Sequence, residues 1–385
     1  MRLPVLLLAA TLLTGCSSLK FWESDEVDEL APAKLVDFSE ELKVDKVWST
    51  SLGAGQKQLD ASLVPVLGGG VIYGADSKGR VSAIDTASGK VLWRENLKRE
   101  LSGGVGFGAG LVLVAGRNGR IIALDSASGD ERWHTNVGKE VLSAPVTNGQ
   151  VVVAQSLDGF LVGLDAISGG ELWRYRVDIP SLTLRSGTSP VITDNTVVAG
   201  FANGKVIALN PLTGSLLWEN RVAMPKGRSE LERMVDIAGS PILVGDVVYA
   251  TSYQGRAAAI TRGTGRSLWY QDASSYQQPG FGEDRIFITL ARDEVQALSS
   301  NSGQPLWSNT QLTYRQLTAP AGVGSHVAVG DAEGYLHVLD ASDGRYVGRR
   351  KVDGSGLRAP IISDGETLYV LDNSGDLGAF RLVRE

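Results

Sequence analysis

The sequence predicts an all-β fold: a single eight-bladed β-propeller of four-stranded antiparallel blades, closed into a ring by the N-terminal strand. Two observations carry this prediction. One phrase recurs at intervals of about forty residues, and most of its copies end in tryptophan, a period typical of propeller blades. The 47 glycines among 385 residues agree with many tight turns between short strands.

The recurring phrase reads as a strand, a tight turn and a second strand. Its clearest copies are "GRVSAIDTASGKVLW" from Gly79, "GRIIALDSASGDERW" from Gly119, "GFLVGLDAISGGELW" from Gly159 and "GKVIALNPLTGSLLW" from Gly204. In the first copy, Val81 and Ala83 fall on one face of a strand. The step from Asp85 to Gly89 then suits a turn in which the Asp side chain accepts a backbone N–H and Gly adopts a positive φ. More divergent copies begin at Gly255, Asp293 and Gly334, and an incomplete one begins at Gly375.

Two further strands precede each phrase. An apolar run such as "VVVAQS", residues 151–156, is joined to the phrase by Asp158-Gly159, a pair typical of two-residue hairpins. A shorter strand before that run is often introduced by a small residue and a proline, as at Ser189-Pro190. Each repeat therefore supplies four antiparallel strands.

The two ends of the repeat region complement each other. The unit that begins at Gly375 lacks its tryptophan strand, whereas residues 45–52 contain Trp48 and lack the other three strands. We expect this N-terminal strand to complete the eighth blade, because a closed ring leaves no open sheet edge for aggregation.

The recurring tryptophans have two possible interpretations, a ligand cage or packing between blades. Their fixed place in the repeat favours packing. The residues concerned are Trp48, Trp93, Trp133, Trp173, Trp218, Trp269 and Trp307.

The first residues, "MRLPVLLLAATLLTGCSS", predict an exported protein. We expect residues 1–15 to be a lipoprotein signal peptide, because the apolar run is too short for a mature membrane-spanning helix. Cys16 is the sole cysteine, and we expect it to be lipidated. We interpret residues 16–44 as an acidic, flexible tether and residues 45–385 as the propeller. The net charge of −6 argues against nucleic-acid binding.

Two consecutive repeats carry extra residues between the outer strand and the next inner strand. These are residues 178–187, the first insertion, and residues 224–238, the second insertion. Equivalent connections lie on one face of a propeller, so we expect the insertions to form one patch. Apolar residues amid charges favour protein docking. The candidate contacts are Leu182, Leu184 and Arg185 in the first insertion, and Arg233, Met234 and Asp236 in the second.

An alternative for the first insertion is purely structural. In it, Leu182 and Leu184 form a small local core, and Arg185 pairs with an acid of the second insertion. A third excess of residues, between Trp48 and Ala83, has no assigned role.

Catalysis has little support in the sequence, and we expect no catalytic residues, no metal site and no cofactor. His134, His326 and His337 are scattered, and no nucleophile motif is present. The glycine-rich run "GGVGFGAG", residues 103–110, lacks the helix that a dinucleotide fingerprint requires.

The pattern A-x-D-x-x-[ST]-G-x-x-x-W, seen from Ala83 and Ala123, resembles the tryptophan-docking repeat of the quinoprotein propellers. That resemblance implies an alternative function, a quinone-dependent dehydrogenase. The dehydrogenases carry a vicinal disulfide beside the quinone, however, and Cys16 stands alone. A ligand-sensing periplasmic propeller is a further alternative.

The cysteine after "LTG", the acidic segment, the eight repeats and "PSLTLR", residues 180–185, together resemble the BamB family. This resemblance implies a non-enzymatic scaffold lipoprotein of the outer-membrane β-barrel assembly machinery, anchored in the outer membrane and facing the periplasm. It implies docking to the POTRA domains of BamA, chiefly the third, through Leu182, Leu184, Arg185 and Asp236. The family's second loop acid falls on Ala238. Nascent outer-membrane proteins are a second candidate partner.

Overall fold

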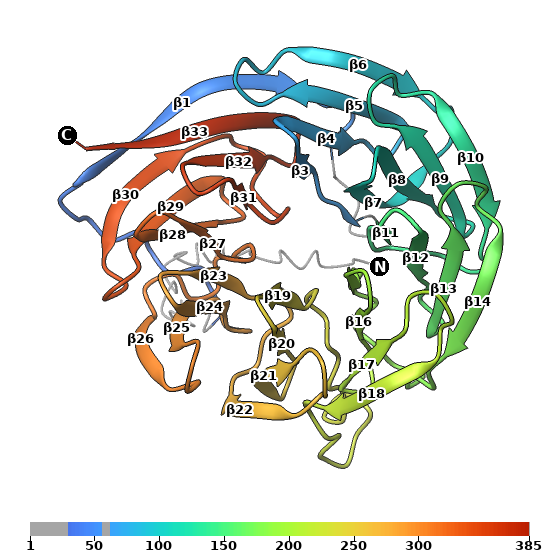
Figure 1. Ribbon diagram of the computed structural model, residues 1–385. Helices are drawn as coiled ribbons and strands as arrows, with labels where there is room; N and C mark the ends of the chain where they lie inside the picture. Colours follow the sequence, from blue (N-terminus) through green and yellow to red (C-terminus); the bar gives the residue numbers. More distant parts are fainter. Residues whose placement is uncertain (1–29, 56–61, 385) are drawn as a thin grey trace, which may run out of the picture. The chain divides into compact units, whose positions relative to one another are not determined.

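Every regular element in the described residues, 30–55 and 62–384, is a β-strand. The computed structural model divides the chain into two units, Met1–Ala31 and Pro32–Glu385, and all the strands belong to the second. Figure 1 shows their sheets side by side in a ring. The described residues include no helix long and apolar enough to cross a membrane. The predicted eight-bladed propeller is confirmed.

Each blade takes four successive strands, ordered from the centre of the ring outward. The first blade contains β3 (Val66–Gly68), β4 (Val71–Ala75), β5 (Arg80–Asp85) and β6 (Val91–Asn96), and the second contains β7 (Leu101–Gly108), β8 (Leu111–Gly116), β9 (Arg120–Asp125) and β10 (Glu131–Asn136). The third contains β11 (Val146–Thr147), β12 (Val151–Gln155), β13 (Phe160–Asp165) and β14 (Glu171–Arg176), and the fourth contains β15 (Val191–Ile192), β16 (Val197–Gly200), β17 (Lys205–Leu209) and β18 (Leu216–Arg221).

The remaining blades follow the same order. The fifth contains β19 (Ile242–Val244), β20 (Val247–Thr251), β21 (Arg256–Thr261) and β22 (Ser267–Asp272), and the sixth contains β23 (Gly280–Gly282), β24 (Arg285–Thr289), β25 (Val295–Ser299) and β26 (Pro305–Asn309). The seventh contains β27 (Ala321–Val323), β28 (His326–Gly330), β29 (Tyr335–Asp340) and β30 (Tyr346–Lys351), and the eighth contains β31 (Ile362–Ser363), β32 (Thr367–Leu371), β33 (Asp376–Arg384) and β1 (Leu42–Ser51).

The second blade departs from the predicted four strands, because a short fifth strand joins its inner edge. Strand β2 (Ser62–Leu63) pairs in parallel with β7, with Ser62 opposite Gly103 and Leu63 opposite Gly104. Leu63 is fully buried there. Part of the unassigned excess between Trp48 and Ala83 therefore extends the neighbouring sheet.

Seven tryptophans fasten their blades to the next, which confirms the packing interpretation. The Nε1–H of Trp133 donates to the carbonyl of Ala166 in the following blade at 2.9 Å. The ring lies so close to Gly169 that a Cβ there would be 2.5 Å from it, and the φ of Gly169 is +72°. Glycine is required on both counts. The same bond joins Trp48 to Thr86, Trp93 to Ser126, Trp173 to Pro211, Trp218 to Arg262, Trp269 to Ser300 and Trp307 to Ala341.

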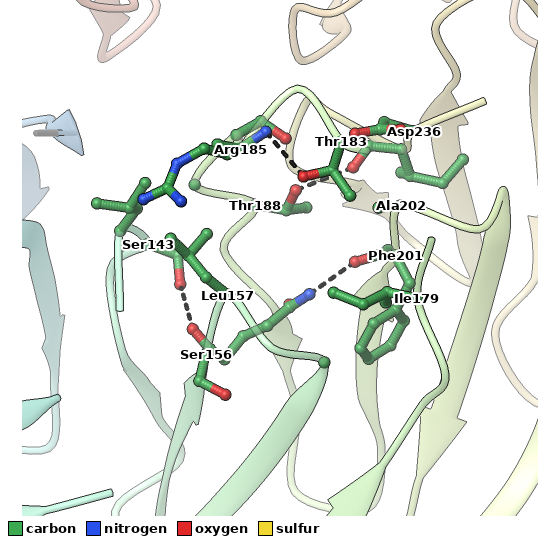
Figure 2. A pocket seen from close by; sticks show the side chains of 17 residues that line it. Ser143, Ser156, Leu157, Ile179, Thr183, Arg185, Thr188, Phe201, Ala202 and Asp236 are labelled. Carbon is green, nitrogen blue, oxygen red and sulfur yellow. Dashed lines mark hydrogen bonds between the residues drawn. The ribbon is translucent and has the colours of Figure 1, made fainter. Parts of the chain in front are cut away.

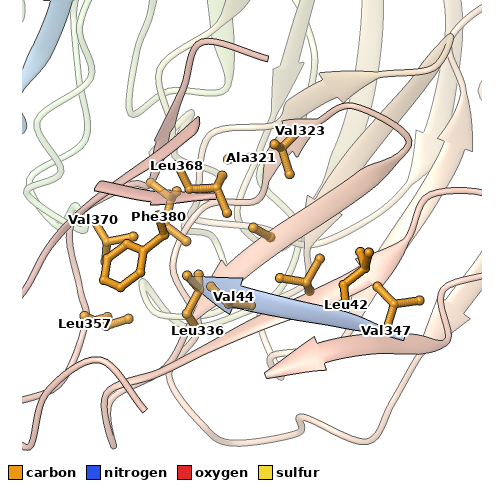
Figure 3. Close-up of a cluster of buried hydrophobic side chains, with 13 residues drawn as sticks. Leu42, Val44, Ala321, Val323, Leu336, Val347, Leu357, Leu368, Val370 and Phe380 are labelled. Atoms are coloured by element: carbon orange, nitrogen blue, oxygen red, sulfur yellow. The ribbon is translucent and has the colours of Figure 1, made fainter. Parts of the chain in front are cut away.

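The N-terminal strand closes the ring as predicted. Strand β1 pairs antiparallel with β33, from Leu42 opposite Arg384 to Ser51 opposite Asp376, and Figure 1 shows the blue and red strands together. Figure 3 shows Leu42 and Val44 among buried side chains of the seventh and eighth blades.

The interface between the seventh and eighth blades is built differently from the other seven. Gly348 occupies the tryptophan position on β30, and a Cβ there would lie 2.7 Å from the carbonyl oxygen of Leu42. Strand β1 therefore fills the space that a large side chain would need. The eighth blade also has no turn between its third and outer strands, because its outer strand comes from the N-terminal side.

A segment that we call the strap, residues 33–41, packs against the core that the sixth and seventh blades share. The ring of Phe38 stacks on Tyr346 with centroids 5.2 Å apart. The guanidinium of Arg349 lies 4.8 Å from the Phe38 centroid, and its Nη1 donates to the carbonyl of Val36 at 2.9 Å. The strap therefore packs on the face of the seventh blade that is turned toward the sixth, whereas Gly348 faces Leu42 and Val44 in the core shared with the eighth.

A buried ionic cluster holds the beginning of the strap. Arg315 donates from Nη1 to the carbonyl of Ala33 at 2.8 Å, and from Nε to Asp331 at 2.8 Å. Nε2 of His337 lies 2.9 Å from the same carboxylate, and the side chains of Asp331 and His337 are fully buried. Burial lowers the pKa of His337.

The folded domain begins earlier in the chain than we expected. We expected the folded domain to begin at residue 45, whereas the second unit begins at Pro32 and β1 begins at Leu42. The acidic composition of residues 16–44 led us to expect a flexible tether there, but Val36 and Phe38 are partly buried and pack against the core. Residues 1–29, including the predicted signal peptide and Cys16, lie outside the described residues.

Substitution of Phe38 tests the strap. The Phe38→Ala change should lower the free energy of unfolding by about 2 kcal/mol, because a mostly covered aromatic ring is lost. Urea unfolding followed by tryptophan fluorescence would measure it. Leu92→Ala, which removes a side chain that is 56% exposed on β6, should change the free energy by less than about 0.5 kcal/mol. Equal stabilities for the two variants would contradict this role.

Candidate docking site

The two insertions lie against each other on one face of the ring, as expected. The first follows β14 and the second follows β18, so both connect an outer strand to the next inner strand. The backbone N–H of Leu184 donates to Oδ2 of Asp236 at 2.6 Å. Just beyond the first insertion, Thr188 donates from Oγ1 to the carbonyl of Ile237 at 2.9 Å. The insertions therefore form one patch.

Asp236 supports the patch from beneath. Its side chain is 1% exposed, and its second oxygen, Oδ1, accepts no hydrogen bond from the described residues. Burial raises the pKa of Asp236 above its ordinary value. Its bond to Leu184 fixes the loop just before Arg185, which has a φ of 50°. Asp236 thus positions the first insertion and presents little surface of its own.

The first insertion presents its predicted contacts to solvent. Leu182 and Leu184 are each 37% exposed, so they do not form the small local core considered as an alternative. Arg185 pairs with Glu140 at 3.1 Å, an acid from the connection before the third blade, and not with an acid of the second insertion. The structure therefore contradicts the alternative in which the first insertion has a purely structural role.

The second insertion divides its candidate residues between surface and interior. Arg233 is exposed, whereas Met234 is 7% exposed and packs inside. Ala238 is also buried, so its side chain offers no contact surface. Met224 is 62% exposed.

Sequence reasoning missed two residues of this patch. Leu231 is 65% exposed at the tip of the second insertion, where its carbonyl accepts from Gln254 Nε2 at 3.0 Å. It lies in the turn 230–233, and Glu232 of this turn accepts the backbone N–H of Arg228, which precedes the turn, at 2.6 Å. Glu140 was also missed. The only signal for it in the sequence is an acidic residue in a short connection.

The space beneath the first insertion is small. A cavity of about 40 Å³ lies there, lined among others by Ser156, Thr183 and Asp236 (Figure 2). Pockets for small ligands are typically several times larger. The patch can therefore bind a partner by its surface rather than by enclosing a small molecule.

Two other features bear on the alternative functions, a quinone-dependent dehydrogenase and a ligand-sensing propeller. A space of about 390 Å³ lies among the inner strands and is lined by residues such as Ser189, Ser240, Tyr276 and Arg358. Within the described residues, no three His, Cys, Asp or Glu side chains gather in a way that could hold a metal ion.

The fold and the repeat define the class of this protein, an eight-bladed propeller with tryptophan-docked blades. The chain belongs to the family of the outer membrane protein assembly factor BamB, whose family model matches residues 45–94, 77–309 and 291–381. It is therefore an outer-membrane protein assembly factor and not an enzyme.

Individual relatives agree with this assignment. The chain is 48% identical over 377 residues to the BamB of Pseudomonas aeruginosa, with 98% of each chain covered. It is 33% identical over 373 residues to that of Escherichia coli, with 94% of each covered. The crystal structure of BamB from Moraxella catarrhalis superposes with a TM-score of 0.80 at 29% identity, covering 88% of this chain and 99% of that one.

The quinoprotein resemblance concerns the fold alone. A quinohemoprotein alcohol dehydrogenase from Pseudomonas putida superposes with a TM-score of 0.69 at 13% identity, covering 88% of this chain and 76% of that one.

The buried carboxylate predicts a pH dependence. Because the pKa of Asp236 is raised above 3.8, the folded state binds this proton more tightly than the unfolded state. Protonated Asp236 therefore adds to the stability of the folded state below the pKa that this group has in the unfolded state. This contribution is lost as pH rises through the pKa of Asp236 in the folded state. The wild type should therefore lose stability relative to Asp236→Asn as pH rises from about 4.

Urea unfolding at a series of pH values would measure this difference. Asp194→Asn, on an exposed turn of the fourth blade, is the matched control and should stay within about 0.5 kcal/mol of the wild type. A difference between wild type and Asp236→Asn that does not change with pH would contradict the assignment.

Proposed function

We propose that the protein is a lipid-anchored scaffold of the barrel-assembly machinery that docks the POTRA domains of BamA, chiefly the third. One observation carries the proposal: two consecutive blades present a continuous patch of exposed leucines and arginines on one face. Leu182 and Leu184 are the apolar anchors, and Arg185 and Arg233 are the charged contacts. Protein interfaces commonly combine apolar anchors with arginine in this way.

The buried members of the predicted site have a different role in this proposal. Met234 and Asp236 face the interior, so they act by holding the exposed residues in place. Asp236 does so through its bond to the backbone of Leu184. The loss of a loop acid at Ala238 does not remove a surface contact, because Ala238 is only 6% exposed.

Docking of this kind assists assembly by fixing the orientation of the POTRA domains relative to incoming substrate. Nascent outer-membrane proteins are a second partner in this proposal. The anchor is a lipid on Cys16, the sole cysteine, which holds the protein at the outer membrane, facing the periplasm.

Charge introduced at an anchor residue tests the docking site. Leu184→Glu should weaken binding to the purified POTRA region of BamA about tenfold or more, because a carboxylate replaces an apolar contact. Leu172→Glu is the matched control, since Leu172 is 49% exposed on β14 of the neighbouring blade. Biolayer interferometry would measure both affinities. Equal affinities for wild type and Leu184→Glu would remove the first insertion from the interface.

The anchor is tested separately. Cys16→Ala should release the protein into the soluble periplasmic fraction, because the acyl chains supply the membrane affinity. Cell fractionation with and without BamA distinguishes lipid anchoring from retention by the partner. Membrane retention of the variant in cells that lack BamA would contradict lipidation at Cys16.

A further inference from the structure

The face that carries the insertions is divided by charge. Over the first two blades and the connection to the third, segments 76–80, 97–100, 116–120 and 137–140 contain seven basic and three acidic residues. The equivalent connections of the sixth to eighth blades, segments 290–294, 310–316, 331–335, 352–358 and 372–376, contain three basic and seven acidic residues. The excess of basic residues on one side is unexpected in a chain with net charge −6. We call the first group of segments the basic arc.

The segments of the basic arc are in contact with one another. The backbone of Arg99 packs on Gly79, where a Cβ would lie 2.1 Å from the Arg99 carbonyl oxygen. Glu100, the next residue, pairs with Arg117 of the second blade at 3.2 Å. The carbonyl of Lys139 lies against Gly119 in the same way. The basic arc is therefore one continuous surface.

The acids of the basic arc are already engaged. Asp76 is 2% exposed, and its carboxylate accepts the backbone N–H groups of Lys78 and Arg80. Glu100 is paired with Arg117, and Glu140 is paired with Arg185.

Four of the seven cations of the basic arc face outward, whereas Arg80, Arg117 and Arg120 are half-buried. The side chains of Lys78, Lys98, Arg99 and Lys139 are exposed. The surface therefore presents positive charge to solvent.

The basic arc is continuous with the docking patch. Glu140 lies in the last segment of the arc and binds Arg185 of the first insertion at 3.1 Å. A partner seated on Leu182 and Leu184 therefore extends over the arc if its own surface continues in that direction. The basic arc attracts an acidic adjoining surface of the partner and repels a basic one.

We propose that the basic arc, led by Lys98, Arg99 and Lys139, binds an acidic surface of the same protein partner that docks on the insertions. This inference rests on the proposed function and names the chemistry of the partner beyond the docking patch. The arc acts mainly by steering the partner during association, since exposed charges raise association rates more than they lengthen the life of a complex.

The test reverses charge on the arc and measures association rates. The double variant Lys98→Glu with Arg99→Glu should associate with the purified POTRA region about tenfold more slowly at low ionic strength. The difference should shrink at about 0.5 M salt, where exposed charges are screened. Lys139→Glu, on a separate connection, should show a smaller change of the same kind.

The matched control reverses the same number of charges on the opposite face. Lys90→Glu with Arg266→Glu alters two exposed residues in turns between third and outer strands, and it should associate at the wild-type rate. Circular dichroism confirms that each variant is folded.

The outcomes separate this inference from the proposed function. If the arc variants associate at the wild-type rate at low salt while Leu184→Glu still loses affinity, the arc lies outside the interface and docking on the insertions stands. If Leu184→Glu also binds normally, the proposed function fails. Loss of binding to phosphatidylglycerol vesicles with unchanged POTRA association would overturn the inference in favour of a lipid surface.

Discussion

The hydrogen bond from an indole N–H to a carbonyl of the next blade is the interaction on which this ring depends. It recurs at seven of the eight interfaces, with bond lengths from 2.6 Å at Trp173 to 2.9 Å at Trp133. Each indole needs a glycine of the next blade beneath it, because any side chain there would collide with the indole plane. Tryptophan and glycine in successive repeats are thus one structural unit, and their joint recurrence sets the spacing of the blades.

Where this unit is missing, the molecule uses a different solution. At the interface of the seventh and eighth blades, β1 passes over Gly348, and Leu42 and Val44 of β1 join the buried core there. Arg315 and Arg349 bind backbone carbonyls of the strap. The strap therefore fixes the chain to the seventh blade just before β1 pairs with β33 and closes the ring.

The sequence alone could predict the blades, because each blade depends on contacts between residues close in the repeat. Closure by Trp48 followed from counting strands. The strap could not be predicted, since it depends on Ala33 meeting Arg315, residues that no local pattern connects. Its acidic composition also resembles that of an unfolded segment, and only Val36 and Phe38 indicate otherwise.

The candidate site also combines features that the sequence could predict with features that it could not. The extra length of the insertions and the identities of Leu182, Leu184 and Arg185 could be read from the sequence. The burial of Asp236 could not, because an acid in a loop is ordinarily exposed. Nor could its bond to Leu184, which joins residues from different blades. Residue type indicates which side chains are able to bind, and only the packing shows which of them reach the surface.

The route by which the chain enters the ring has a mechanical consequence. A pull on the N-terminal side of Pro32 reaches the strap before it reaches β1, because Ala33 and Val36 are bound to arginines of the ring. Those bonds must therefore break before the pull reaches the pairing between β1 and β33. The strap thus anchors the chain to the seventh blade ahead of the strand that closes the ring.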